Sequence, residues 1–205
     1  MKGSASILFS TAYLPPIEYF VWIMKSDLIV IEKEENYIKQ TYRNRCEIYT
    51  ANGKIALTIP VIKTNGNHTK TKDIKIDYSE KWQLKHWRAI VSAYNHSPYF
   101  LFYKDELEPF YSNNYKFLID FNTQLLQTIL KLVPINRKII FTTEYLSQVK
   151  QNYFDLRYKI SPKIPSPFDS CVYSQVFKEK HGFQPNLSII DLLFNVGPQS
   201  KDYLT

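Results

Sequence analysis

The first thirty residues contain two apolar runs, separated by a proline turn and a short segment of helical periodicity. The apolar runs are Ser6 to Ser10 and residues 28–31, and the residues that recur at helical spacing between them are Ile17, Phe20, Val21 and Met24. Pro15 and Pro16 end the first run, because proline donates no ladder hydrogen bond but fits the first turn of a helix. A strand, a helix and a strand at this spacing predict a βαβ unit with parallel strands and a right-handed crossover.

The rest of the chain alternates strand, turn and helix signals. Asn52-Gly53 between two alternating runs predicts a β-hairpin, and the lysine-containing segment 63–72 predicts an exposed, mobile loop. Helices are expected at 79–94 (capped by Ser79), 99–110, 117–133, 173–180 and 189–194, and strands at 74–76, 138–142 and 155–160. The sequence therefore predicts a layered α/β fold with a mixed sheet whose early strands are parallel, a β-hairpin and helices on both faces.

Length and composition favour one soluble domain over residues 1–205. Hydrophobic residues make up 44% of the 205 and charged residues 22%, which suffices for a core. Lys25 and Asp27 interrupt the most apolar stretch, so we expect no transmembrane segment. Met1 to Ser10 lacks the pattern of a signal peptide, and the two cysteines suggest no disulfide framework. We therefore expect a cytoplasmic protein.

Charge and motifs narrow the possible ligands. The net charge of +7 favours anionic partners, such as a nucleotide-sugar or another phosphorylated small molecule. The lysines are dispersed among carboxylates, so we expect no nucleic-acid binding. Phosphate-loop, dinucleotide-binding, nucleophile-elbow and zinc-protease motifs do not occur in the sequence, and neither a cofactor nor a metal site is assigned.

Three segments are more specific than a fold requires: Tyr13 to Phe20, Tyr42 to Arg45, and residues 186–198. Together with Trp82, His86 and Tyr94, they resemble the signature segments of the WbqC-like protein family in order and spacing, over nearly the whole chain. The resemblance implies an association with bacterial O-antigen and other surface-polysaccharide clusters. It further implies a role in decorating a sugar with an amino-acid or acyl group.

Two arginines are the leading candidates for ligand binding. Arg43 and Arg45, placed on one strand, would point to the same face and clamp a diphosphate, with Asn44 on the opposite face. On this hypothesis Arg43→Ala weakens ligand binding far more than folding. The alternative is ion pairing of these arginines with Glu32, Glu34 or Glu35.

His86 and Asp191 are the candidate catalytic residues. Imidazole is the usual general base near neutral pH, and Asp191 would orient it or hold a sugar hydroxyl. The alternatives are a core histidine and a structural carboxylate. The remaining candidate ligand-binding residues come from the first turn, the aromatic helices and the last segment: Tyr13, Pro15, Tyr19, Trp82, Tyr94, Tyr99, Asn195 and Gly197.

These residues are expected to converge on one pocket at the carboxyl end of the first strand, where open α/β sheets bind ligands. The leading hypothesis is a transferase acting on a nucleotide- or lipid-linked sugar in surface-polysaccharide synthesis. The alternative is a non-catalytic sugar- or nucleotide-binding scaffold that serves a neighbouring biosynthetic enzyme.

Overall fold

The computed structural model describes residues 6–147 and 153–204. Its centre is a four-stranded, wholly parallel sheet in the order β7-β2-β1-β8. The strands are β1 (Ser6–Ser10), β2 (Leu28–Glu32), β7 (Lys138–Phe141) and β8 (Tyr153–Asp155). Between β1 and β2 runs α1 (Ile17–Met24), and Ile7 pairs with Ile29 in parallel register. The βαβ start with parallel strands is therefore confirmed.

Two small antiparallel sheets lie outside the parallel one. The predicted hairpin is formed by β3 (Arg45–Thr50) and β4 (Gly53–Thr58), with Thr50 opposite Gly53 at the turn. Gly53 has φ +91°, which explains why glycine stands at this tight turn. A shorter pair is formed by β5 (Val61–Ile62) and β6 (Lys75–Ile76).

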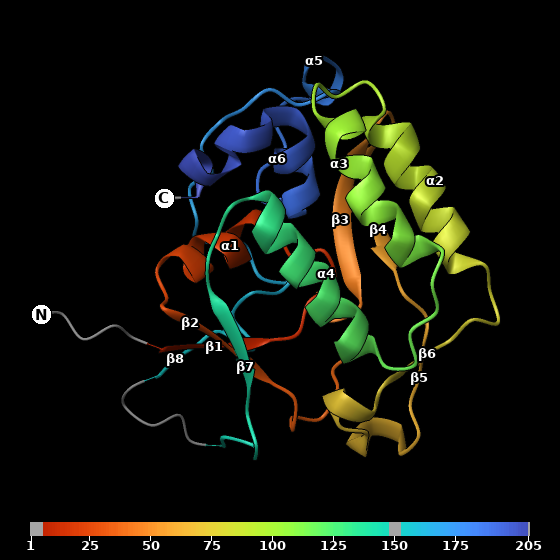
Figure 1. Cartoon of the computed structure of the whole chain (residues 1–205), viewed down its shortest axis with the longest axis vertical. Helices are drawn as coiled ribbons and strands as arrows, with labels where there is room; N and C mark the ends of the chain where they lie inside the picture. Colours follow the sequence, from red (N-terminus) through yellow and green to blue (C-terminus); the bar gives the residue numbers. More distant parts are fainter. Residues whose placement is uncertain (1–5, 148–152, 205) are drawn as a thin grey trace, which may run out of the picture.

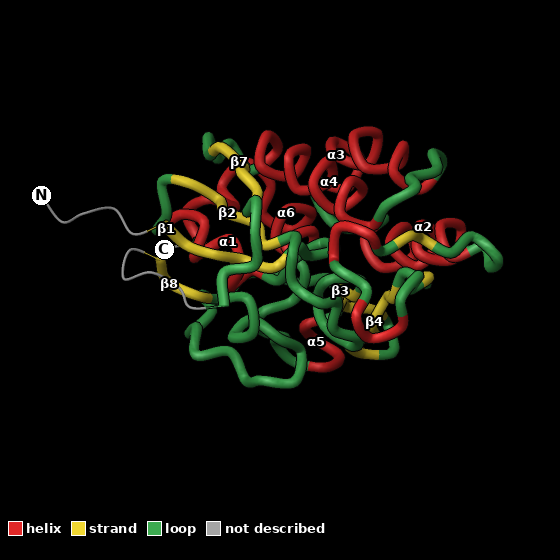
Figure 2. Tube along the Cα trace, turned by 90° about the horizontal axis from the view of Figure 1, so that it is seen from below, coloured by secondary structure: helices red, strands yellow, loops and turns green. Residues whose placement is uncertain are grey.

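The helices pack beside the sheets around one hydrophobic core. They are α2 (Trp82–Tyr94), α3 (Phe100–Leu107), α4 (Leu118–Leu132), α5 (Lys178–His181) and α6 (Ile189–Val196). Figure 1 shows α1 and α6 above the parallel sheet. Helix α4 runs from the sheet toward the hairpin, and α2 and α3 lie at the upper right, near the hairpin. Seen from below, most helices gather along one side and a long loop region along the other (Figure 2). The α/β class, with its parallel strands, hairpin and helices, is confirmed.

The core reaches both faces of the parallel sheet. Phe9 and Ile31 belong to the main apolar cluster, together with Phe121 of α4 and Phe194 of α6. Leu8 precedes Phe9 on β1, so its side chain points to the opposite face of the sheet, and it is also fully buried. Burial of both faces is typical of a parallel sheet and explains the continuous apolar runs in the sequence. Within the described residues, no helix combines the length and apolar character that crossing a membrane requires.

Several boundaries differ from the sequence-based expectations. Helix α2 begins at Trp82 rather than at Ser79, whose amide instead donates to Asp77 Oδ1 at 2.9 Å. Segment 63–72 is mostly exposed, as expected for a loop, but it contains two 3₁₀ turns and buries Thr69 and Thr71. Helix 173–180 shrinks to the four residues of α5, and strand 155–160 shrinks to β8, which ends at Asp155.

Candidate functional site

The carboxyl ends of the four parallel strands meet at one edge of the sheet. Ser10 pairs with Glu32 at the ends of β1 and β2, while Leu8 pairs with Asp155 at the end of β8. The chain continues from this edge into Glu34 and Glu35 after β2 and into Arg157 after β8. Ligands of open α/β sheets bind at this edge, so the charged groups gathered there are the first place to look for a site.

A buried ion-pair network lies directly behind the edge. Glu32 accepts hydrogen bonds from Thr142 Oγ1 at 2.6 Å and from Arg157 Nη1 at 3.1 Å. Arg157 also forms a two-point pair with Asp155, at 3.0 Å from Nε and 2.8 Å from Nη2. Burial would raise the pKa of Asp155, but the hydrogen bonds from Arg157 outweigh it and the pKa is lowered. The network is electrostatically satisfied, as buried charges require.

Arg43 and Glu35 form the second part of this network. Arg43 Nε and Nη2 each donate to a different oxygen of Glu35 at 2.8 Å, and Arg43 Nη2 also lies 3.3 Å from the carbonyl oxygen of Arg157. Burial raises the pKa of Glu35, with the Arg43 charge opposing it. The expected strand placement of Arg43 was wrong, since β3 begins only at Arg45. The pairing with Glu35, left open as an alternative, is confirmed.

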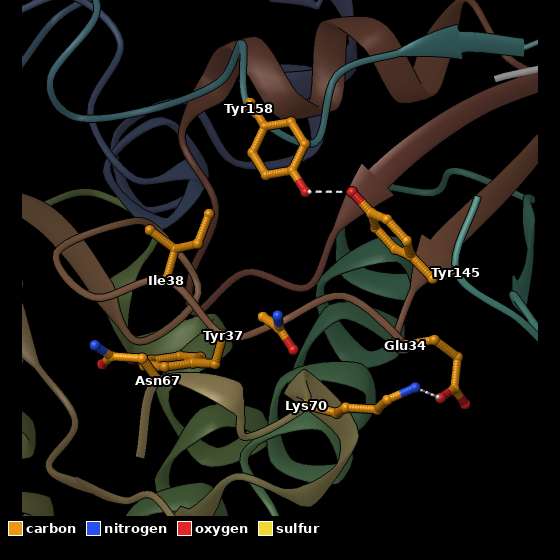
Figure 3. A pocket seen from close by; sticks show the side chains of 8 residues that line it. Glu34, Tyr37, Ile38, Asn67, Lys70, Tyr145 and Tyr158 are labelled. Carbon is orange, nitrogen blue, oxygen red and sulfur yellow. Dashed lines mark hydrogen bonds and ion pairs between the residues drawn. The ribbon is translucent and has the colours of Figure 1, made fainter. Parts of the chain in front are cut away.

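An open cavity of about 470 Å³, here named the edge cavity, lies in front of these pairs. Its lining residues come from the segment after β2, the 3₁₀ turns and the segments on either side of β8: Glu34, Asn36, Tyr37, Ile38, Asn67, Lys70, Tyr145 and Tyr158. Figure 3 shows the hydroxyls of Tyr145 and Tyr158 facing each other, 3.4 Å apart. This volume is within the range of small-molecule sites.

The tyrosines connect the edge cavity to the buried charges. The guanidinium carbons of Arg43 and Arg157 lie 5.8 and 5.5 Å from the centre of the Tyr158 ring. Burial raises the pKa of Tyr158 and of Tyr37, so both phenols are neutral donors near pH 7. The hydroxyl of Tyr37 is buried and has no hydrogen-bond partner among the residues that the structure describes. A buried hydroxyl in this condition is one that a ligand or water can satisfy.

A carboxylate and an ammonium group lie at the rim of the edge cavity. Lys70 Nζ is 3.2 Å from Glu34 Oε2, as Figure 3 shows, and Lys72 Nζ is 2.9 Å from the same carboxylate. Hydrogen bonds from Lys72 and Lys70 lower the pKa of Glu34 although partial burial acts against them. The edge cavity therefore offers an ionised acceptor and a cation beside aromatic walls. Such a set suits hydroxyl and phosphate groups.

The residues that the sequence singled out lie elsewhere, in separate clusters. Tyr13 Oη is 3.0 Å from His86 Nδ1 and 2.9 Å from Tyr111 Oη, and the Trp82 ring centre is 5.1 Å from that of His86. His86 is 5% exposed, and burial lowers its pKa to about 4. The imidazole is therefore neutral at pH 7. Its role as a general base stays a prediction.

Asp191 is at the centre of another buried cluster. It accepts hydrogen bonds from Tyr94 at 2.9 Å, Tyr173 at 2.6 Å and Gln175 at 2.9 Å. Burial raises the pKa of Asp191 to about 6, although these three donors act against it. Tyr173 and Gln175, which were expected in helix 173–180, lie in a non-helical segment and donate hydrogen bonds to this carboxylate. Asn195 Nδ2 donates to the Asp191 carbonyl at 2.7 Å, which ties the cluster to α6.

The other candidates make structural contacts. Tyr19 donates to the Ser10 carbonyl at 2.9 Å, and Asn44 Nδ2 donates to the Ile59 carbonyl at 2.8 Å. The Pro15 carbonyl accepts from the Ile189 amide at 2.9 Å, which joins the first turn to α6. Gly197 faces the ring of Tyr99, and Arg45, with a side chain 33% exposed, lies 3.7 Å from Glu47. None of these residues lines the edge cavity, and their convergence with His86 and Arg43 on one pocket stays a prediction.

The residues that the sequence reasoning missed are Glu34, Tyr37, Lys70, Tyr145 and Tyr158. One signal was present, because Glu32 ends a buried parallel strand and Glu34 and Glu35 follow shortly after it, so all three must lie near its carboxyl edge. No cluster of three or more His, Cys, Asp or Glu side chains suited to a metal ion occurs within 6–147 and 153–204.

Comparisons with known proteins agree with the signature segments. The model of the WbqC-like protein family matches residues 11–165 and 159–203. A relative described as an uncharacterized protein, Rv1507c of Mycobacterium tuberculosis (strain ATCC 25618 / H37Rv), is 30% identical over 217 residues and covers 94% of each chain. No solved structure matches the chain. Since the family model spans nearly the whole sequence, this chain belongs to the WbqC-like protein family.

Proposed function

We propose that this protein is a transferase that modifies a nucleotide- or lipid-linked sugar, with an amino-acid or acyl group, in bacterial surface-polysaccharide synthesis. We further propose that the edge cavity binds the sugar and its phosphate. The observation that carries the proposal is the combination of Tyr37, Tyr145 and Tyr158 with the Glu34–Lys70 pair in one open cavity at the carboxyl edge of a parallel sheet.

The chemistry of the lining matches this ligand class. Tyrosine rings offer flat apolar faces to sugar C–H groups and hydroxyls at their ends, while the amides of Asn36 and Asn67 donate and accept hydrogen bonds. Lys70 offers a charge for phosphate, and the ionised Glu34 accepts from sugar hydroxyls. Because Arg43 and Arg157 are held behind the wall by carboxylates, Lys70 rather than an arginine clamp is the proposed phosphate contact.

One observation favours the scaffold alternative. Three of the charged groups at this edge already have partners within the protein: Glu34 with two lysines, Arg43 with Glu35, and Arg157 with Asp155 and Glu32. A pocket whose charged groups are paired in this way can bind a sugar, but it offers no activated nucleophile for a transfer reaction. Transfer of a labelled glycyl or acyl group to a sugar acceptor separates the two functions. Tight binding of the sugar without turnover would favour the scaffold.

Two lysines provide a matched test of the binding site. Lys70 and Lys72 both pair with Glu34 and are similarly exposed, at 46% and 39%, but Lys70 lines the edge cavity and Lys72 is not among its lining residues. We expect Lys70→Ala to weaken binding of UDP-, dTDP- or GDP-sugars by about tenfold or more, because a charge-assisted contact is lost. Isothermal titration calorimetry measures this change.

The control is Lys72→Ala, which removes the same kind of ion pair and should leave the affinity within about twofold. Equal loss of affinity in both variants would mean that the lysines act only through their pairing with Glu34, or that they attract the phosphate by their overall positive charge rather than by a direct contact from Lys70. No loss in Lys70→Ala would contradict the placement of the phosphate in the edge cavity.

A further inference from the structure

A second, apolar hollow lies next to the edge cavity. This apolar groove, of about 480 Å³, is lined by Trp22 of α1, Phe154 of β8, Leu156, Ile164 and two prolines of the following segment. The Trp22 and Phe154 rings stack with their centres 5.0 Å apart. Phe154 and Ile164 are 39% and 50% exposed, so the described residues leave this apolar surface open to solvent. Open apolar hollows of this kind are typical of ligand sites.

Tyr158 joins the apolar groove to the edge cavity. Its side chain lines both hollows, while Arg43 and Arg157 hold its ring from behind. A single ligand that passes Tyr158 would therefore contact polar groups at one end and apolar groups at the other. This arrangement points to an amphiphile, because most of the groove's lining residues are aliphatic or aromatic and few of them could hydrogen-bond the polar edge of a base or a ribose.

The charges around the apolar groove suit an anionic amphiphile. Lys159 Nζ lies 4.5 Å from the centre of the Phe154 ring, and Lys25 Nζ lies 5.1 Å from the centre of the Trp22 ring. Both lysines are exposed, and their ammonium groups lie over the faces of these rings. Glu18 is the acidic group that lines the groove, and its carboxylate is buried 3.4 Å from Asn186 Nδ2. Lys159 is therefore the exposed charged residue that lines the groove itself, whereas Lys25 lines the adjoining hollow together with the exposed Asp169.

We propose that the apolar groove holds the hydrocarbon chain of a lipid-linked substrate whose phosphate and sugar occupy the edge cavity. This inference rests on the proposed function and selects the lipid-linked substrate from the two classes named there. Tyr158, which lines both hollows, and the ammonium group of Lys159 beside the apolar wall are the reasons for choosing a lipid chain over a protein partner.

Alkyl phosphates of increasing chain length test the inference without the natural substrate. Inorganic phosphate, butyl, octyl and dodecyl phosphate are titrated into the whole protein by calorimetry, below the concentrations at which they form micelles. We expect affinity to rise by about fourfold for each methylene that enters the groove, until the groove is filled. An affinity that does not depend on chain length would overturn the inference.

Two exposed apolar residues of the same region provide a variant and its control. Ile164→Asp places a charge in the apolar groove, whereas Val172→Asp alters a side chain that is 60% exposed and is not among the groove's lining residues. We expect Ile164→Asp to abolish the dependence on chain length while leaving phosphate binding unchanged, and Val172→Asp to retain both. Ile164→Ser serves as a milder variant if the thermal midpoint of Ile164→Asp falls.

Two results would overturn the assignment. Chain-length dependence that survives Ile164→Asp would place the chain elsewhere, and a dimer that dissociates in Ile164→Asp, seen by sedimentation velocity, would assign the groove to a second copy. The proposed function is read separately from the Lys70→Ala titration with nucleotide-sugars, which carry no hydrocarbon chain. Failure of the inference can therefore be distinguished from failure of the proposed function.

Discussion

Removal of the Arg43 guanidinium is the sharpest test of how this molecule uses its buried charges. Arg43 is 2% exposed and Glu35 is 1% exposed, and two hydrogen bonds of 2.8 Å join them. Arg43→Ala leaves the Glu35 carboxylate buried without its counter-charge. Breaking a buried pair in this way costs about 3–5 kcal/mol, a large part of the 5–15 kcal/mol by which a typical domain is stable.

The sequence-based hypothesis was that Arg43→Ala would weaken ligand binding far more than folding. Burial reverses that expectation, because the largest effect now falls on the free energy of unfolding. Urea denaturation followed by far-UV circular dichroism measures it, with the midpoint and slope fitted for each variant. We expect the midpoint of Arg43→Ala to fall sharply or the variant to be unfolded at the start.

Two comparisons make the measurement specific. Arg45→Ala removes a half-buried arginine that lies 3.7 Å from the Glu47 carboxylate, and should cost about 1 kcal/mol or less. The double variant Arg43→Met/Glu35→Gln removes both charges and should recover most of the stability lost in Arg43→Ala. If Arg43→Ala unfolded within about 1 kcal/mol of the wild type, the buried pair would not be the structural element inferred here.

Two further predictions concern the buried titrating groups and one glycine. With pKa values of about 4 for His86 and about 6 for Asp191 in the native state, against ordinary values of 6.5 and 3.8, the two groups act oppositely on acidification. As the pH falls from about 6 to 4, the histidine is protonated in the unfolded chain before it is protonated in the native state, so His86 favours unfolding. The aspartate is protonated in the native state before it is protonated in the unfolded chain, so Asp191 favours folding. Relative to wild type, His86→Gln should therefore gain stability across this window and Asp191→Asn should lose it, as measured by urea denaturation at several pH values; slopes of the same sign would contradict the assignment. Gly197→Ala would place a Cβ 2.6 Å from Tyr99 Cε1 at φ +66°, and should cost about 2–4 kcal/mol by thermal denaturation, whereas Gly66→Ala, with open space at φ +50°, should cost about 1 kcal/mol. Equal costs at the two glycines would show that the Tyr99 ring simply moves aside.

Features with local causes were predicted well from the sequence. The proline turn between β1 and α1, the Asn52-Gly53 hairpin and the amphipathic α4 each depend on neighbouring residues, and the structure confirms them. The prediction of a helix at 173–180 was wrong for a non-local reason. Its helical spacing was outweighed by Asp191, which needs Tyr173 and Gln175 as hydrogen-bond donors from an extended chain.

The candidate site was predicted only at its coarsest level, as the carboxyl edge of a parallel sheet. The pairing of Arg43 with a nearby glutamate was within reach, since the two residues are eight positions apart. The contact of Glu32 with Arg157 spans 125 positions, and no local pattern relates them. The same holds for Tyr145 and Tyr158, which become a cavity wall only through the placement of β8 beside β1.

By itself, the sequence determined the α/β class and the edge at which ligands are expected, because periodicity and turn residues are local properties. Its signature segments indicated the family by resemblance. Tertiary structure alone decided which polar groups are buried and which face solvent. His86 and Asp191 look catalytic in the sequence, but packing encloses both, while Lys70 and Tyr158 look ordinary and line an open cavity. Solvent exposure depends on contacts between segments that are distant in the sequence, so it cannot be predicted from the spacing of residues along the chain.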